Sequence, residues 1–146
     1  GGLPSEEETL KLKMLIHLVG DMHCPMHAGR LSDIGGNLRP VLMFGKKTNL
    51  HSAWDTAIPE AARKWSYTEW VDNIDILDRK RKQQLATGTP ADWLTETHAV
   101  CEKIYEDTPE DSELSYQYMF DNYPVVEQQL LRAGLRLADI LNSIYK

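Results

Sequence analysis

Apolar residues near the start of the chain recur at helical spacing. Leu12, Leu15, Ile16 and Val19 would all lie on one side of a helix. The segment 5–8, Ser-Glu-Glu-Glu, precedes them and matches a capping box, in which serine and glutamate side chains bond the free N–H groups of the first turn. The pattern therefore predicts a helix over residues 6–23.

Helical periodicity returns in the second half of the chain. Residues 67–77 form one candidate helix, and Pro90 marks the first turn of another, where its missing N–H costs little. The stripe of this helix expected to face the core holds Leu94, Cys101, Ile104 and Tyr105. His98 falls on the same stripe and is expected as a hydrogen-bonded interior histidine. Residues 116–145 predict a long amphipathic helix, or two helices joined at Pro124.

One short segment is predicted to be a β-strand. Val41-Leu-Met-Phe44 is apolar and short, and Pro40 in front of it favours an edge position because proline cannot donate to a sheet ladder. Gly45-Lys-Lys47 is its expected turn. The predicted fold class is therefore all-α, with at most a short β-hairpin near residues 38–48.

Length and composition favour one domain over residues 1–146. The chain has 146 residues, 42% of them hydrophobic, which is enough for a single core. No apolar run approaches the roughly 20 residues that span a bilayer, so no membrane partner is expected. No signal peptide is visible in this chain.

The charge balance argues against a broad basic binding face. The net charge is −6 and the pI is near 5.3, whereas proteins that hold nucleic acid by charge alone are basic. A basic run at residues 78–82 and the pair Lys46 and Lys47 are better explained as solvated surface than as phosphate contacts. Any strong positive potential would have to come from bound metal.

Histidines and aspartates at fixed spacing suggest where that metal binds. His17 and Asp21 are four residues apart, as are His51 and Asp55, and this spacing puts two side chains on one helix face, about 5–6 Å apart at Cβ. His27 would point away from a straight helix, but Pro25 favours a bend that returns it to the same cavity. Imidazole with carboxylate suits zinc better than calcium or magnesium. Five such groups are more than one ion needs.

Two nearby residues are set apart from the ligands. His23 lies about 240° round the helix from His17, so it is expected to support the site or the fold from outside the ligand set. Cys24 is a possible ligand by chemistry, but it lies off the His17 face beside the bend, which argues against that role. Cys24 and Cys101 permit at most one internal disulfide.

Taken together, these motifs resemble the S1/P1 nuclease family, zinc-dependent enzymes that hydrolyse single-stranded nucleic acid and 3'-nucleotides. The resemblance rests on His17-x3-Asp21-x-His23-x-Pro25-Met26-His27, Gly35-Gly36-Asn37, Thr48-Asn49-Leu50-His51-Ser52-x-Trp54-Asp55 and Tyr123-Pro124-Val125-Val126-Glu127. It implies a mainly helical phospholipase C/P1 nuclease-like fold. It also implies 5'-phosphorylated products, water activated by zinc, and a secreted or periplasmic location.

The resemblance also implies residue roles. Three zinc ions are expected in the complete family enzyme, with His17 and Asp21 in a paired site and Asp21 as the bridge. The remaining zinc is expected on a second set of ligands, His27, His51 and Asp55. Asn37 matches a position near the nucleobase pocket, where its amide would offer a donor and an acceptor to a base; a plain turn residue after two glycines is an equal alternative.

One departure from the family pattern limits what this chain is expected to do alone. Family members begin with a zinc-binding tryptophan, followed by further histidine and aspartate ligands, but the 16 residues before His17 contain no histidine, aspartate, cysteine or tryptophan. The chain is therefore expected to be the C-terminal part of the nuclease domain, with the family's catalytic aspartate absent and at most one complete metal site. Such a fragment would be weak or inactive and would expose apolar surface, favouring self-association or pairing with the N-terminal part.

Two other functions remain open from the sequence. A zinc-dependent phospholipase C shares the fold and a related His-x3-Asp motif, but it has glutamate where Asp55 stands and lacks Asn-Leu-His-Ser-x-Trp. A non-catalytic helical zinc-binding module would use the histidines to hold the fold together. An all-protein ligand set would favour that module, whereas catalysis requires a position open to water.

Overall fold

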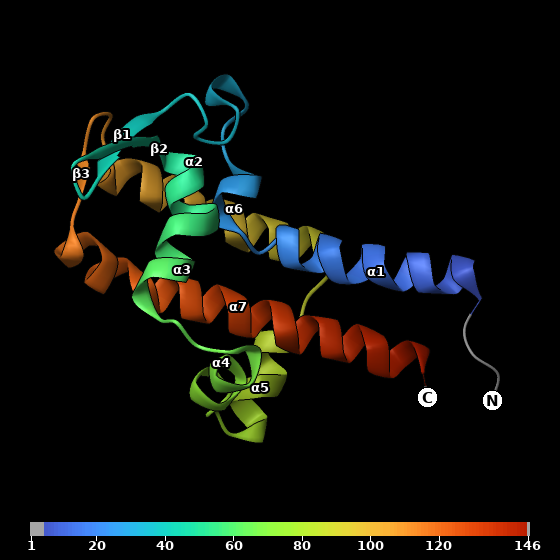
Figure 1. Ribbon diagram of the computed structural model, residues 1–146. Helices are drawn as coiled ribbons and strands as arrows, with labels where there is room; N and C mark the ends of the chain where they lie inside the picture. Colours follow the sequence, from blue (N-terminus) through green and yellow to red (C-terminus); the bar gives the residue numbers. More distant parts are fainter. Residues whose placement is uncertain (1–4, 146) are drawn as a thin grey trace.

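The computed structural model of the protein describes residues 5–145 and is mainly helical (Figure 1). The larger helices are α1 (Glu6–Asp21), α4 (Tyr67–Ile74), α5 (Arg79–Ala86), α6 (Pro90–Asp107) and α7 (Tyr116–Ile144). The short elements are two 3-10 turns (Pro25–Ala28 and Leu31–Asp33), the strands β1 (Pro40–Met43), β2 (Lys46–Asn49) and β3 (Glu113–Leu114), and a helical segment made of α2 (Leu50–Ser52), a π turn (Ala53–Ala57) and α3 (Ile58–Ala62). Helix α7 packs against α1 on one side and against α4 and α5 on the other.

The helix ends follow the local signals in the sequence. Ser5 and Glu8 form the expected capping box, with the Glu8 N–H donating to Ser5 Oγ at 3.2 Å. Helix α1 ends at Asp21, two residues earlier than predicted. Cys24 has an extended backbone in front of Pro25, because the proline ring disfavours helical geometry in the residue before it.

The hairpin forms near the predicted residues, but its turn is Phe44 and Gly45, since Lys46 and Lys47 pair with Met43 and Leu42 as part of β2. The sheet also differs from the prediction. A third strand is present: β3 pairs in parallel with β1, which makes β1 the central strand in the order β2-β1-β3. The prediction that Pro40 keeps this strand at an edge was therefore wrong. Pro40 is the first residue of β1, and its carbonyl still accepts a bond from the Asp111 N–H at 2.8 Å, so the missing donor falls where the ladder begins.

Two prolines are tolerated inside helices. Helix α7 continues through Pro124, so the single-helix alternative holds. Pro59 does not end the segment that carries His51 and Asp55, which continues to Ala62. Pro59 lies in the first turn of α3, directly after the π turn, where a missing N–H is tolerated.

The core joins the sheet, the α2–α3 segment, α6 and α7. Its fully buried side chains include Met26, Val41, Leu50, Ile58, Cys101 and Leu114. On α6 the buried stripe begins at Trp93, while Leu94 is 45% exposed, so the predicted stripe was rotated by one residue at that end. His98 is exposed and bonds the Ala28 carbonyl at 2.7 Å, so it is hydrogen-bonded as expected but does not lie in the core.

Helix α1 keeps several large apolar side chains in solvent. Leu10, Met14 and Leu18 follow each other at four-residue spacing and are 60%, 47% and 52% exposed. Only Val19 of this helix is buried. An uncovered apolar stripe of this kind was expected from the sequence and is typical of a contact surface. Within residues 5–145, no helix has the length and apolar character needed to cross a membrane.

Candidate metal centre

A sharp bend after α1 brings His27 back beside Asp21. The Cys24 N–H bonds the Asp21 carbonyl at 3.0 Å, and the 3-10 turn that begins at Pro25 places His27 one turn further on. As a result His27 Nδ1 lies 3.4 Å from Asp21 Oδ1. The bend that Pro25 predicts is therefore present, and it returns His27 to the carboxylate.

The second arm of the site is the helical segment that begins at Leu50. Asn49 caps it, with its Oδ1 accepting the Ser52 N–H at 2.7 Å. His51 Nδ1 bonds the Gly35 carbonyl at 2.9 Å, which leaves Nε2 free for another partner. Gly35 has φ +60 and a Cβ there would lie 2.5 Å from the Met26 carbonyl oxygen, so this support requires glycine.

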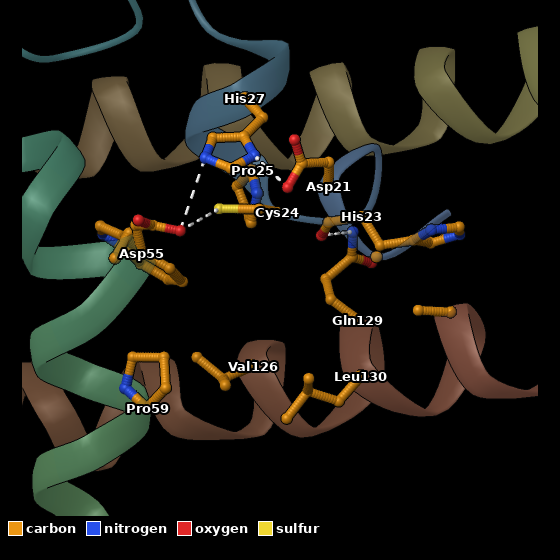
Figure 2. A pocket seen from close by; sticks show the side chains of 13 residues that line it. Asp21, His23, Cys24, Pro25, His27, Asp55, Pro59, Val126, Gln129 and Leu130 are labelled. Carbon is orange, nitrogen blue, oxygen red and sulfur yellow. Dashed lines mark hydrogen bonds and ion pairs between the residues drawn. The ribbon is translucent and has the colours of Figure 1, made fainter. Parts of the chain in front are cut away.

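Donor atoms from the two arms form a connected series. His17 Nε2 lies 3.5 Å from Asp21 Oδ2, and the other oxygen of Asp21 faces His27. His27 Nε2 in turn lies 3.5 Å from Asp55 Oδ1 (Figure 2). The rings of His27 and His51 stack with centroids 5.2 Å apart. Asp21 therefore lies between His17 and His27, and His27 lies between Asp21 and Asp55. His51 is connected to the series by ring stacking alone, and within residues 5–145 the donor atoms that lie within 4.8 Å of one another do not include it.

These three separations are longer than typical hydrogen bonds and close to the separation of two ligands on one ion. Hydrogen bonds between nitrogen and oxygen have lengths of about 2.7–3.2 Å, shorter than the 3.4–3.5 Å seen here. Two ligands with bonds of about 2.0–2.1 Å to a tetrahedral zinc ion are separated by about 3.3 Å. Each pair therefore has a separation compatible with two ligands of one zinc ion. Because a neutral imidazole binds an ion through one ring nitrogen, His27 would share an ion either with Asp21 or with Asp55.

Cys24 lies inside this group, although the sequence argued against it. Its Sγ is 3.7 Å from Asp55 Oδ1, and one donor atom each of Cys24, His27 and Asp55 lie within 4.8 Å of one another. Burial raises the pKa of the Cys24 thiol to about 11 in the absence of a cation. The bend that brings His27 back to Asp21 begins at Cys24, so the same bend turns the Cys24 thiol toward Asp55. This consequence of Pro25 is the signal that the sequence analysis missed.

A cavity of about 290 Å³ opens beside the donors. Asp21, His27 and Asp55 line one side of it, and the apolar side chains of Val126 and Leu130 on α7 line the opposite side (Figure 2). An ion at the donors would therefore face a space walled partly by apolar groups, which strengthens electrostatic interactions within it.

A buried network outside the donor set holds the bend in place. His23 is 2% exposed, its Nδ1 lies 2.7 Å from the Val19 carbonyl oxygen, and its Nε2 lies 2.9 Å from Arg136 Nη1. Because a guanidinium has only donors, Nε2 accepts and the ring proton sits on Nδ1. Burial also lowers the pKa of His23. Gln129 Nε2 donates to the His23 carbonyl at 2.9 Å. Both ring nitrogens are thus engaged, and sequence reasoning had not found Gln129 or Arg136.

Asn37 lies in a turn. Its Nδ2 donates to the Ile34 carbonyl at 2.8 Å, and the side chain is exposed. This contact is the local one expected of a residue that follows two glycines. It leaves Oδ1 of Asn37 available as an acceptor.

Fold and site together define a class: a mainly helical protein with a metal-type His/Asp centre between two arms of the chain. The model of the S1/P1 nuclease family matches residues 2–146, and the chain belongs to this family. It is 31% identical to Endonuclease 4 and 32% identical to Endonuclease 2 of Arabidopsis thaliana, each over 94% of this chain and 51% and 52% of the relative. It is 31% identical to Nuclease S1 of Aspergillus oryzae over 97% of this chain and 56% of that protein. The chain spans about half the length of the curated relatives it matches.

Proposed function

We propose that this chain is part of a zinc-dependent nuclease that hydrolyses phosphodiester bonds in single-stranded DNA and RNA, leaves 5'-phosphorylated products and removes phosphate from 3'-nucleotides. Family membership supports the nuclease class. The observation that carries the proposal is the series of donor atoms at 3.4–3.5 Å from His17 to Asp55, beside a cavity. In this proposal residues 1–146 belong to a single domain.

The residues divide into two groups in this proposal. His27, His51 and Asp55 hold one zinc ion, and His17 and Asp21 contribute to a paired site in which Asp21 is the bridge. When bound, zinc brings the pKa of a coordinated water toward about 7 and offsets the charge of the phosphate. The Gly35 carbonyl orients the His51 ring, as backbone acceptors commonly do for ligating histidines. Asn37 offers Oδ1 to a base edge.

Activity belongs to the whole protein in this proposal. His17 and Asp21 are two ligands, fewer than the three protein ligands usual at a catalytic zinc site. The 146-residue chain by itself is therefore expected to be weak or inactive. The proposal includes a secreted or periplasmic location, which rests on family membership alone.

Chelation of the whole protein tests this proposal. Cleavage of single-stranded DNA and release of phosphate from a 3'-nucleotide are expected to fall by at least about a hundredfold on treatment with a chelator, because the donors then hold no cation. Zinc should restore both reactions and magnesium should not, since imidazole ligands favour zinc. The rates are measured with the two substrates and with phosphatidylcholine as the control.

Three results would decide against the proposal. Hydrolysis that survives chelation would remove the role of the metal. Cleavage of phosphatidylcholine in place of DNA would favour the phospholipase class. Bound zinc in the whole protein with no hydrolysis of any of the three substrates would favour a non-catalytic zinc module. The observation that supports this alternative is the Cys24 thiol among the donors, because thiolates are common ligands of structural zinc.

A further inference from the structure

We propose that the Cys24 sulfur, as a thiolate, ligates the same ion as His27 and Asp55. This inference deepens the proposed function and rests on a metal being bound there. It assigns to that ion a sulfur ligand, which the resemblance to the nuclease family does not supply.

The distances match those of a shared ion. With bonds of about 2.3 Å to sulfur and about 2.0 Å to oxygen, two ligands on a tetrahedral zinc ion are separated by about 3.5 Å. Cys24 Sγ and Asp55 Oδ1 are 3.7 Å apart, and His27 Nε2 is 3.5 Å from the same oxygen. Three donor atoms of three chemical types therefore lie within 4.8 Å of one another, and Figure 2 shows the side chains that carry them.

The backbone fixes the thiol in this position. Cys24 lies between the end of α1 and Pro25, with its N–H on the Asp21 carbonyl at 3.0 Å and its carbonyl accepting the His27 N–H at 3.1 Å. The same turn thus presents the thiol and the imidazole to Asp55 on the other arm. A coordinated thiol is deprotonated by the cation, and its proton leaves to solvent.

A sulfur ligand changes what this ion can do. Cys24, His27 and Asp55 would give this ion three protein ligands, and a fourth from the chain, such as His51, would leave no open position, the arrangement of structural zinc sites. The reacting water would then belong to the side of the cluster that contains Asp21 and His17. Thiolate would also shift metal preference toward softer ions.

Cobalt substitution tests the sulfur ligand directly. Cobalt(II) is titrated into the 146-residue chain, into Cys24→Ala and into Cys101→Ala, and the absorption spectrum and bound cobalt are recorded. We expect a near-ultraviolet sulfur-to-cobalt charge-transfer band in the unaltered chain and in Cys101→Ala, and loss of the band in Cys24→Ala. Cys101 is the matched control because it is the other free cysteine and its side chain is fully buried in the core.

The outcomes separate this inference from the proposed function. Cobalt bound without a sulfur band in the unaltered chain would overturn the Cys24 ligand and leave the His/Asp site standing. No bound cobalt or zinc would overturn the Cys24 ligand and also the assignment of a complete metal site to His27, His51 and Asp55 in this chain, whereas the nuclease class is decided by the assays of the whole protein. Zinc-edge X-ray absorption of the unaltered chain needs no variant: a sulfur shell at about 2.3 Å supports the inference, and a shell of nitrogen and oxygen alone at about 2.0–2.1 Å contradicts it.

Discussion

Replacing Asp21 with asparagine is expected to lower phosphodiester hydrolysis by the whole protein by at least about a hundredfold, because even partners outside the ligand set cost 10–100-fold when removed. The two oxygens of Asp21 face His17 at 3.5 Å and His27 at 3.4 Å. Asparagine keeps the shape but turns one of these oxygens into an amide nitrogen, which has no free lone pair for a cation. The rate is measured on single-stranded DNA, together with the zinc content.

The control for this substitution is Asp72→Asn, which makes the same chemical change at an exposed position of α4. It should leave the rate and the zinc content unchanged. If Asp21→Asn retains its zinc and most of its activity, Asp21 does not bridge two ions and the paired site is wrongly assigned.

Replacing Arg136 with methionine is expected to destabilise the 146-residue chain by about 3 kcal/mol, because it leaves buried polar groups without partners. The Arg136 side chain is 3% exposed and pairs with Glu96 of α6. It also donates to the Leu85 carbonyl at 3.0 Å and to His23 Nε2 at 2.9 Å, and its guanidinium lies 5.1 Å from the centre of the Trp93 ring. Methionine restores the packing volume but none of these bonds. The free energy of unfolding is measured in urea.

Arg81→Met provides the comparison, since Arg81 is exposed on α5. Exposed positions of this kind change stability by less than about 0.5 kcal/mol. Equal stability of the two variants would show that the Arg136 network does not hold the bend. A loss confined to Arg136→Met, accompanied by weaker zinc binding, would place the network in support of the site.

The sequence alone predicted those features of the fold that local interactions determine. Ser5 with Glu8 set the start of α1, because this capping box involves residues three positions apart. Pro25 likewise fixed the bend, since a proline restricts the residue in front of it. The position of His27 beside Asp21 followed from the bend.

Features that depend on tertiary contacts were not predictable in the same way. Strand β1 became central only because β3, some 70 positions later, pairs with it. The choice of Trp93 in place of Leu94 for the core depends on how α6 is rotated against the rest of the protein, which periodicity leaves uncertain by one residue. Arg136 is a charged residue on an amphipathic helix, for which the sequence favours an exposed position. It is buried because His23, Glu96 and Leu85 supply its acceptors.

Cys24 illustrates the same limit within the site. Its angular position was derived from a straight helix, and α1 ends three residues before it. His23 keeps the position that a straight helix gives it, since it still bonds Val19 one turn back. Cys24 does not, because the residue before a proline leaves helical geometry.

The central claim is that side chains from two arms of the chain converge on one cation, and anomalous diffraction from crystals soaked in zinc tests it most directly. The account predicts a zinc peak at about 2.0–2.1 Å from a ring nitrogen of His27 and about 2.0–2.2 Å from a carboxylate oxygen of Asp55. Absence of a peak between these two side chains, in crystals where they retain the arrangement described above, would contradict it.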